Sequence, residues 1–390
     1  MKKILFTAAA AFSLALTAQV PDIPLLKVFH SASTRNPAEN VLLSPWGIQE
    51  CFGMVSGGAG KNSAEELSKI LGLDKNVSEK ICRARKSLTQ SKTDFKSYNA
   101  VFFDRRLNVK NEFIRHATKL YNGNLYSVNF NDKAECAKVL NNIVSRGTSG
   151  VFKKVFNENS FSPAPDMLLL NVLYFNGSWD TAFDRGSTSK GAFYLQSPSK
   201  RKIFVKMMND TRTVPYYNDG TVHGIMLDYT DRRFNMSVLT TVDKDKPLSA
   251  VTELLANKGI SYILRNSSRF NETVIKLPKL KLSGETNLKS LLSSMGMTKV
   301  FDSRQPDLTG TIKEGATYVS CAQQLVKLEL DEVKTEVAAV TYAYTVGSAP
   351  DPTPPKYNFF YANHPFVLVL FDSETRAILL TAAVVNPAAY

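Results

Sequence analysis

Cysteine is scarce in this sequence, and its cysteines are widely spaced. The 390 residues include four of them, Cys51, Cys82, Cys136 and Cys321, and no C-x-x-C pair. This spacing indicates neither a zinc site nor a dense disulfide scaffold. We expect buried free thiols, and the spacing leaves any pairing of the cysteines open.

The motifs of catalysis are missing as well. The sequence has no G-x-S-x-G elbow and no H-E-x-x-H pair, and its four histidines lie far apart. No combination of nucleophile, general base and metal ligands is therefore visible. We predict that the protein is not an enzyme and that it uses no cofactor and no metal.

One glycine-rich stretch, "SGGAGKNSAEELSKILG" at residues 56–72, is similar to a phosphate-binding loop but does not complete the motif. Val55 stands where the first glycine is required, and Asn62 stands where Ser or Thr should follow Lys61. The same residues fit a turn followed by a helix. We predict that Ser63 is the N-cap of that helix.

After the N-terminus, no hydrophobic run is long enough to cross a membrane. Residues 1–18 have the features of a secretory signal peptide, namely Lys2 and Lys3, a short apolar run and the small residue Ala18. We expect cleavage after Ala18 and a bacterial-type exported protein that is extracellular or periplasmic. Leu16 is less usual than Ala at its position, so cleavage a few residues away stays open.

Acidic residues are fewer than basic ones, and the formal net charge is +13. Such a surface attracts polyanions in a salt-dependent way. The basic residues are nevertheless spread along the chain, and only "RARK" (83–86) and "RRLNVK" (105–110) form clusters. These clusters fit either ordinary solvated surface or a binding site for a polyanion. We expect no specific nucleic acid as a partner.

The order of the periodic segments indicates the fold class. Amphipathic helical patterns dominate the first third of the chain, whereas apolar or alternating strand patterns dominate after residue 166. With 44% hydrophobic residues, no linker-like segment and no internal repeat, residues 19–390 fit one large domain. We predict an α+β fold with large mixed sheets.

Several segments, in order along the whole chain, resemble motifs of the serpins. They are "NVLLSPWGI", "GAGKNSAEEL", "LLLNVLYFNGSWDTAF", "LPKLKLSGETNLKSLLSSMGMTKVFD" and "NHPFVLVLFDSETRAILLTAAVVNP". The resemblance implies the serpin fold, with three β-sheets, about eight or nine helices and an exposed reactive-centre loop. It also implies a metastable monomer that inhibits serine or cysteine proteases.

In that family a protease attacks the loop, and the cleaved loop enters the main sheet while the protease is still bound as an acyl-enzyme. The resemblance places the hinge and loop at about residues 332–358. The hinge residues are Glu332, Lys334, Thr335, Glu336, Val337, Ala338, Ala339, Val340 and Thr341. Alternate residues from Thr335 are small or β-branched and uncharged, which is the pattern that an inserted strand needs on its core side.

Counting from Glu332, the family spacing places the reactive bond between Ser348 and Ala349, with Val346 and Gly347 as neighbouring alternatives. Small residues there suit an elastase-like, subtilisin-like or papain-like target. Lys334 replaces the glycine that inhibitors usually carry before the hinge threonine, and lost flexibility slows insertion. A non-inhibitory serpin that acts as a binding, carrier or storage protein is therefore the alternative.

The resemblance also implies a shutter and a breach, where the main sheet opens. Ser44, Asn171 and Trp179 match the family pattern, whereas Gln324 occupies the position of a usual histidine and Gly47 that of a usual serine. We expect Gln324 to reach Asn171 by hydrogen bonds, without a pH-dependent charge. Ordinary core packing is the alternative role for each of these residues.

Overall fold

The computed structural model describes residues 19–88, 94–196, 201–230, 232–332 and 356–389. The predicted signal peptide, the hinge from Lys334 to Thr341 and the reactive bond at Ser348 and Ala349 lie outside these ranges. The described ranges contain nine α-helices: α2 (Ile23–Arg35), α3 (Pro45–Ser56), α4 (Lys61–Leu71), α5 (Lys75–Leu88), α6 (Asn111–Arg115), α7 (Lys133–Gly147), α8 (Ser249–Lys258), α9 (Ile260–Arg265) and α10 (Leu288–Ser294).

Short helical turns complete the helical part of the same ranges. They are the π-helical η1 (His116–Leu120) and the 3₁₀ turns η2 (Glu158–Phe161), η3 (Arg185–Ser187) and η4 (Lys299–Phe301).

Three sheets hold the strands, as the resemblance implies. In spatial order, the five-stranded sheet contains β11 (Leu280–Asn287), β12 (Cys321–Leu330), β4 (Met167–Asn176), β2 (Asp94–Asp104) and β3 (Asn124–Val128). The six-stranded sheet contains β1 (Val41–Leu43), β15 (Ile378–Val384), β14 (Phe366–Asp372), β9 (Phe234–Thr241), β8 (Val222–Asp228) and β7 (Tyr216–Asn218). The four-stranded sheet contains β13 (Tyr357–Tyr361), β10 (Glu272–Pro278), β6 (Lys202–Thr213) and β5 (Ser189–Tyr194).

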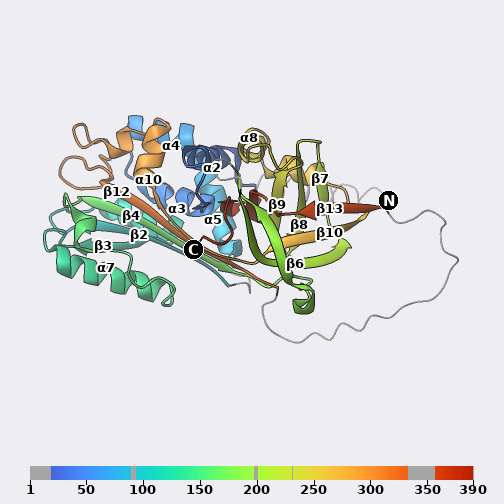
Figure 1. The fold of residues 1–390 in the computed structure, drawn as a ribbon. Coiled ribbons are helices and arrows are strands. Elements are labelled where there is room, and N and C mark those ends of the chain that lie inside the picture. The colour runs from blue at the N-terminus through green and yellow to red at the C-terminus, as the bar shows by residue number, and fades with distance from the viewer. Residues whose placement is uncertain (1–18, 89–93, 197–200, 231, 333–355, 390) are drawn as a thin grey trace, which may run out of the picture.

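The five-stranded sheet is covered on both faces. Helix α7 lies on one face, and α3 with α5 lies on the other (Figure 1). Alternate residues of β4 therefore enter two different cores: Leu169 and Leu173 pack with α3 residues, whereas Leu168 and Leu170 pack with α7 residues. Burial on both faces explains why this strand is an almost continuous apolar run.

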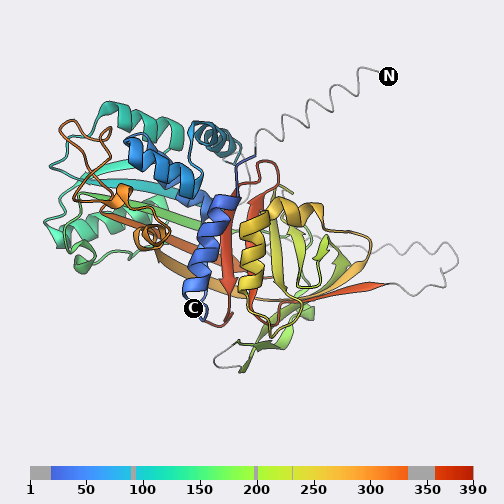
Figure 2. The same cartoon turned by 90° about the horizontal axis from the view of Figure 1, so that it is seen from above.

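The other two sheets lie together at the far end of the molecule from α7 (Figures 1 and 2). Strands β9, β14 and β15 are buried along their whole length, in agreement with their apolar sequences. Helices α2 and α8 lie side by side across the middle (Figure 2). The α+β prediction with three sheets and about eight or nine helices is confirmed.

The predicted N-cap at Ser63 is wrong. Helix α4 begins three residues earlier than that cap would give, at Lys61, with Gly60 as its N-cap, and Ser63 is buried within the first turn. The Ser63 backbone N–H donates instead to the carboxylate of Asp307, at 2.7 Å. An acceptor from a distant loop thus replaces the local cap, and short-range patterns do not reveal such a contact.

Candidate functional site at the β4–β12 seam

The pairing of β4 with β12 differs from its neighbours in direction. These two strands run parallel, from Leu168 opposite Cys321 to Phe175 opposite Leu328. The flanking pairs, β11 with β12 and β2 with β4, are antiparallel. We call this parallel pairing the seam.

The middle of the seam is closed by side-chain amides. Gln324 of β12 lies opposite Asn171 of β4, and both side chains are fully buried. The Gln324 Nε2 donates to Asn171 Oδ1 at 2.7 Å and to the Ser44 carbonyl oxygen at 2.9 Å. Its Oε1 accepts from the Ser44 backbone N–H at 2.8 Å. The expected hydrogen bond between Gln324 and Asn171 is therefore present.

Ser44 joins the seam to helix α3. It is the N-cap of α3, since its Oγ accepts from the Gly47 N–H at 2.9 Å, and the same hydroxyl donates to the Leu379 carbonyl at 2.8 Å. A Cβ at Gly47 would lie 2.1 Å from Asn171 Oδ1. The Asn171 side chain thus occupies the space that a serine at position 47 would need.

A second layer of polar groups continues from Asn171 under the sheet. Asn171 Nδ2 donates to Asn99 Oδ1 at 2.7 Å, and Asn99 Nδ2 in turn donates to the carboxylate of Glu50 on α3. Arg85 of α5 forms an ion pair with the other carboxylate oxygen of Glu50. Burial raises the pKa of Glu50, against the lowering effects of Arg85, Asn99 and Ser97.

Sequence reasoning missed Asn99, Glu50 and Arg85. The one available signal was an acidic residue within the otherwise apolar segment "IQECFGMV". Its partner Arg85 lies in the "RARK" cluster, which the sequence alone presents as a run of surface cations. The fold turns Arg85 inward while Arg83 stays exposed.

Another set of contacts fixes the end of β12 and Glu332, which follows it. Trp179 Nε1 donates to the Asp331 carbonyl at 2.9 Å, and its ring stacks on Tyr229 with centroids 4.5 Å apart. Glu332 is buried, with Lys279 Nζ 2.5 Å and Thr188 Oγ1 2.8 Å from its carboxylate. Burial raises the pKa of Glu332, but hydrogen bonds from Lys279 and Thr188 outweigh it and hold the pKa below its ordinary value.

Comparison with known proteins identifies the family of this chain. The family model "Serpin (serine protease inhibitor)" matches residues 25–387. The chain belongs to the serpin family. The family and two relatives of this chain are named as protease inhibitors, which agrees with the prediction that the protein is not an enzyme.

Relatives of this serpin cover nearly its whole length. Alpha-1-antiproteinase of Rattus norvegicus is 28% identical over 93% of this chain and 86% of its own length. Plasminogen activator inhibitor 1 of Neovison vison is 27% identical over 93% and 91% of the two chains. Native protease nexin-1, solved with heparin, has a TM-score of 0.83 at 21% identity, with 96% of this chain and 99% of that chain covered. Maspin has a TM-score of 0.83 at 22% identity with the same coverage, and these two structures confirm the serpin fold.

The cysteines of this serpin are all free, as expected, although only Cys51 and Cys136 are fully buried. Burial raises the pKa of each thiol, so all four are protonated near neutral pH and are poor nucleophiles. Within the described ranges, no group of three His, Cys, Asp or Glu residues could hold a metal, and no helix is long and apolar enough to span a membrane.

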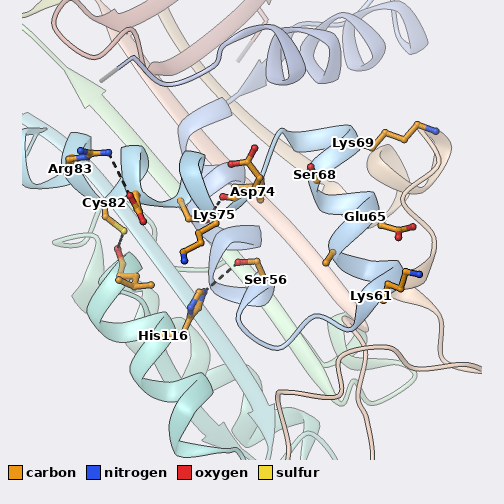
Figure 3. A pocket seen from close by; sticks show the side chains of 15 residues that line it. Ser56, Lys61, Glu65, Ser68, Lys69, Asp74, Lys75, Cys82, Arg83 and His116 are labelled. Atoms are coloured by element: carbon orange, nitrogen blue, oxygen red, sulfur yellow. Dashed lines mark hydrogen bonds and ion pairs between the residues drawn. The ribbon is translucent and has the colours of Figure 1, made fainter. Parts of the chain in front are cut away.

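A groove of about 1160 Å³ lies away from the seam, between α4, α5 and η1 (Figure 3). Its rim carries cations and acids together: Lys61, Lys69, Lys75 and Arg83 alternate with Glu65, Asp74 and Glu79. His116 and Cys82 bind backbone carbonyls in its wall. Because the charges are mixed, this groove does not form a basic surface.

Proposed function

We propose that this serpin is an exported suicide inhibitor of serine or papain-like cysteine proteases, which it traps by inserting its cleaved loop between β4 and β12. The parallel seam is the observation that carries this proposal. Strand β12 ends at Leu330, and a chain that turns back after Glu332 would run antiparallel to both β12 and β4. The inserted strand would then have two antiparallel neighbours in the sheet.

The energy of insertion is sufficient to drive a one-way change. A new central strand adds on the order of ten backbone hydrogen bonds, each worth about 0.5–1.5 kcal/mol net. About 10 kcal/mol is therefore available. While the loop is intact, both of its ends are fixed, by Glu332 at one side and by β13 at the other. Cleavage releases one end.

The trap follows if insertion is faster than hydrolysis of the acyl-enzyme. The protease is then carried along with the loop and its active site is distorted. A displacement of about 1 Å in a catalytic site costs on the order of 100-fold in rate. The product is a covalent complex of serpin and protease.

We place the reactive bond between Ser348 and Ala349, with Val346 and Gly347 as near alternatives. Small residues at these positions favour elastase-like, subtilisin-like or papain-like targets. Strand β13 begins at Tyr357, so the last two residues of the expected loop span 332–358 already pair with β10. We also propose that residues 1–18 are a signal peptide, that residues 19–390 form a single domain, and that the protein acts as a monomer.

The test is to mix the purified protein with elastase, subtilisin and papain and to analyse the products by denaturing gel and intact mass. The proposal predicts a boiling-resistant band at the summed mass and a released C-terminal peptide that begins near Ala349. Cleavage without that band, and without a gain in thermal stability, would favour a binding, carrier or storage serpin. Lys334 in the hinge is the feature that keeps this second candidate open.

We also propose a polyanion site on the four-stranded sheet, for which the charge pattern is the support. Lys190 of β5 and Lys206 of β6 lie directly opposite each other, which is unfavourable for like charges unless an anion lies between them. The Nζ atoms of Lys190 and Lys202 lie 5.4 and 5.3 Å from the ring centre of Phe204, which is 55% exposed. Among the described residues, no carboxylate forms an ion pair with these three lysines.

Heparin–agarose chromatography tests this site. The triple variant Lys190→Ala, Lys202→Ala and Lys206→Ala should elute at clearly lower salt than the wild type. A control with the same loss of charge replaces the exposed Lys153, Lys154 and Lys313 with alanine. Equal elution of the two variants would reject the site, because net charge alone would then explain binding.

A further inference from the structure

We propose that Glu50, held by Arg85, is a positioning residue for loop insertion, because it fixes β2 and β4 to helix α3 and thereby limits opening of the seam. This inference rests on the proposed insertion mechanism. Glu50 and Arg85 do not lie on the sheet. They lie on α3 and α5 beneath it, and their effect on the strands passes through hydrogen bonds.

Helix α3 is tied to both sides of the seam. On the β12 side, Gln324 binds the backbone N–H and carbonyl of Ser44, the N-cap of α3. On the other side, the Glu50 Oε2 accepts from the Ser97 hydroxyl of β2 at 3.0 Å and from Asn99 Nδ2 of β2. One helix therefore bridges the seam: its N-cap is hydrogen-bonded to β12, and its second turn is hydrogen-bonded to β2.

The hydrogen bonds on the β2 side of the seam also extend to β4. Asn99 lies opposite Asn171 in the β2–β4 register, and its Oδ1 accepts from Asn171 Nδ2. Glu50, Asn99 and Asn171 thus form a continuous chain of buried hydrogen bonds from α3 to the edge of the seam. Any movement of β4 away from β12 must either carry α3 along or break this chain.

Arg85 allows Glu50 to hold β2 strongly. The Glu50 side chain is 3% exposed and that of Arg85 is 14% exposed, so the pair is shielded from solvent. Arg85 binds Oε1 and leaves Oε2 for the two β2 side chains. A buried carboxylate that loses its donors is less favourable than a neutral amide that loses them. We therefore expect the seam to part at the Gln324 contacts, with α3, β2 and β4 moving as one body.

Two double variants separate the effect of the hydrogen bonds between Glu50 and β2 from the effect of the Glu50–Arg85 charges. Glu50→Gln with Arg85→Met removes both charges but keeps a side-chain oxygen that can accept from Ser97 and Asn99. Glu50→Leu with Arg85→Met has the same loss of charge and no acceptor. The two proteins differ at one side chain only, and a difference between them reports the hydrogen bonds to β2.

A third variant controls for lost stability. Asp372→Asn weakens another buried pair, in which the Arg233 Nε lies 2.9 Å from Asp372 Oδ1 beside the six-stranded sheet. Asp372 is the last residue of β14, in a different sheet from the seam strands β4 and β12, and the contact of Arg233 with the Ser87 carbonyl of α5 does not involve the Asp372 side chain that is changed. If ordinary destabilisation controlled insertion, this variant would change the insertion rate as much as a Glu50 variant of equal stability.

The measurement is the rate at which each intact protein takes up a synthetic peptide of residues 334–347, followed by the gain in thermal stability. We expect the Leu/Met variant to take up the peptide at least about tenfold faster than the Gln/Met variant, which corresponds to the loss of about one hydrogen bond to a charged or polar partner. The Gln/Met variant should stay within about threefold of the wild type, and Asp372→Asn should not accelerate uptake.

Equal rates for the two Glu50 variants would overturn the inference, as would equal acceleration by Asp372→Asn. The protease assay separates this failure from a failure of the proposed function. If the wild type traps a protease and the Glu50 variants insert at the same rate, only the role of Glu50 is wrong. If no variant takes up peptide and no protease is trapped, insertion itself is contradicted, and the inference with it.

Discussion

Gln324 forms three of the hydrogen bonds that close the middle of the seam. A neutral amide makes these bonds at any pH, because it donates to Asn171 and to the Ser44 carbonyl while it accepts from the Ser44 N–H. The usual family histidine would have fewer groups for the same task and would titrate. We therefore expect the Gln324 contacts of the seam to be insensitive to pH.

Replacing Gln324 by leucine should lower the free energy of unfolding by about 2–4 kcal/mol. The reason is that buried polar groups of Ser44 and Asn171 lose their partners, at about 1–3 kcal/mol for each unsatisfied group. Urea unfolding of the intact protein measures the change. Gln323→Leu, one residue away and only partly buried, is the matched control. A loss no greater than that of the control would mean that Gln324 is ordinary core packing.

His223 should make the stability depend on pH through another region. Burial, with a smaller effect of nearby His364, lowers the pKa of His223 from 6.5 to about 4. The folded protein thus keeps this ring neutral, whereas the unfolded chain protonates it below about pH 6.5. Its contribution to stability is complete above pH 6.5 and is lost as the pH falls towards 4, by about 2–3 kcal/mol.

Urea unfolding at several pH values between 4 and 7 tests this in the wild type and in His223→Phe. The variant should lose part of the pH dependence. Its free energy of unfolding, compared with that of the wild type at the same pH, should therefore be more favourable at pH 4 than at pH 7. The same slope in both proteins would show that His223 does not titrate as the structure indicates.

At the scale of elements, much of the fold could be predicted from the sequence. The apolar run of β4 and the buried strands β14 and β15 have the continuous apolar pattern that is typical of a fully buried strand. The serpin-like motifs, rather than periodicity, predicted that Asn171 and Gln324 lie together near Ser44, and the structure shows hydrogen bonds among them. These predictions succeeded because each rests on a local pattern or on a motif.

Other contacts could not be predicted, because they join segments that are distant in sequence. The ion pair of Glu50 with Arg85 requires α3 and α5 to pack side by side, and the capping of α4 by Asp307 requires a loop some 240 residues later to return. The ion pair of Lys279 with Glu332 could not be predicted for the same reason, because it also joins segments that are distant in sequence. Composition and periodicity report what one segment prefers and do not report which segment it meets.

The hinge is the element whose sequence departs most from that of an inhibitor. Lys334 stands where glycine is usual, so Lys334→Gly should restore flexibility and speed insertion relative to hydrolysis of the acyl-enzyme. We expect fewer serpin molecules to be cleaved for each protease molecule trapped, by a factor of about two or more. Titration of a trapped protease with wild type and variant measures this ratio. Lys334→Ala, which also removes the charge, is the control, and equal ratios for the Gly and Ala variants would assign the effect to charge.

At the scale of the whole molecule, we propose that the main sheet is held in a five-stranded state that becomes more stable when a sixth strand enters at the seam. The contacts of Gln324 and Glu332 lie along the path of that strand, whereas Glu50 acts on the seam from α3, through its hydrogen bonds to β2. They oppose a change that the backbone hydrogen bonds favour by about 10 kcal/mol. The two states should therefore differ most clearly in thermal stability.

The most direct measurement compares the melting temperature of the intact protein with that of protein cut once within residues 345–355 by subtilisin or elastase, with the cut verified by intact mass. We predict that the cut protein melts at least about 10 °C higher, since about 10 kcal/mol is gained in a chain of this size. Equal or lower melting of the cut protein would contradict insertion at the seam.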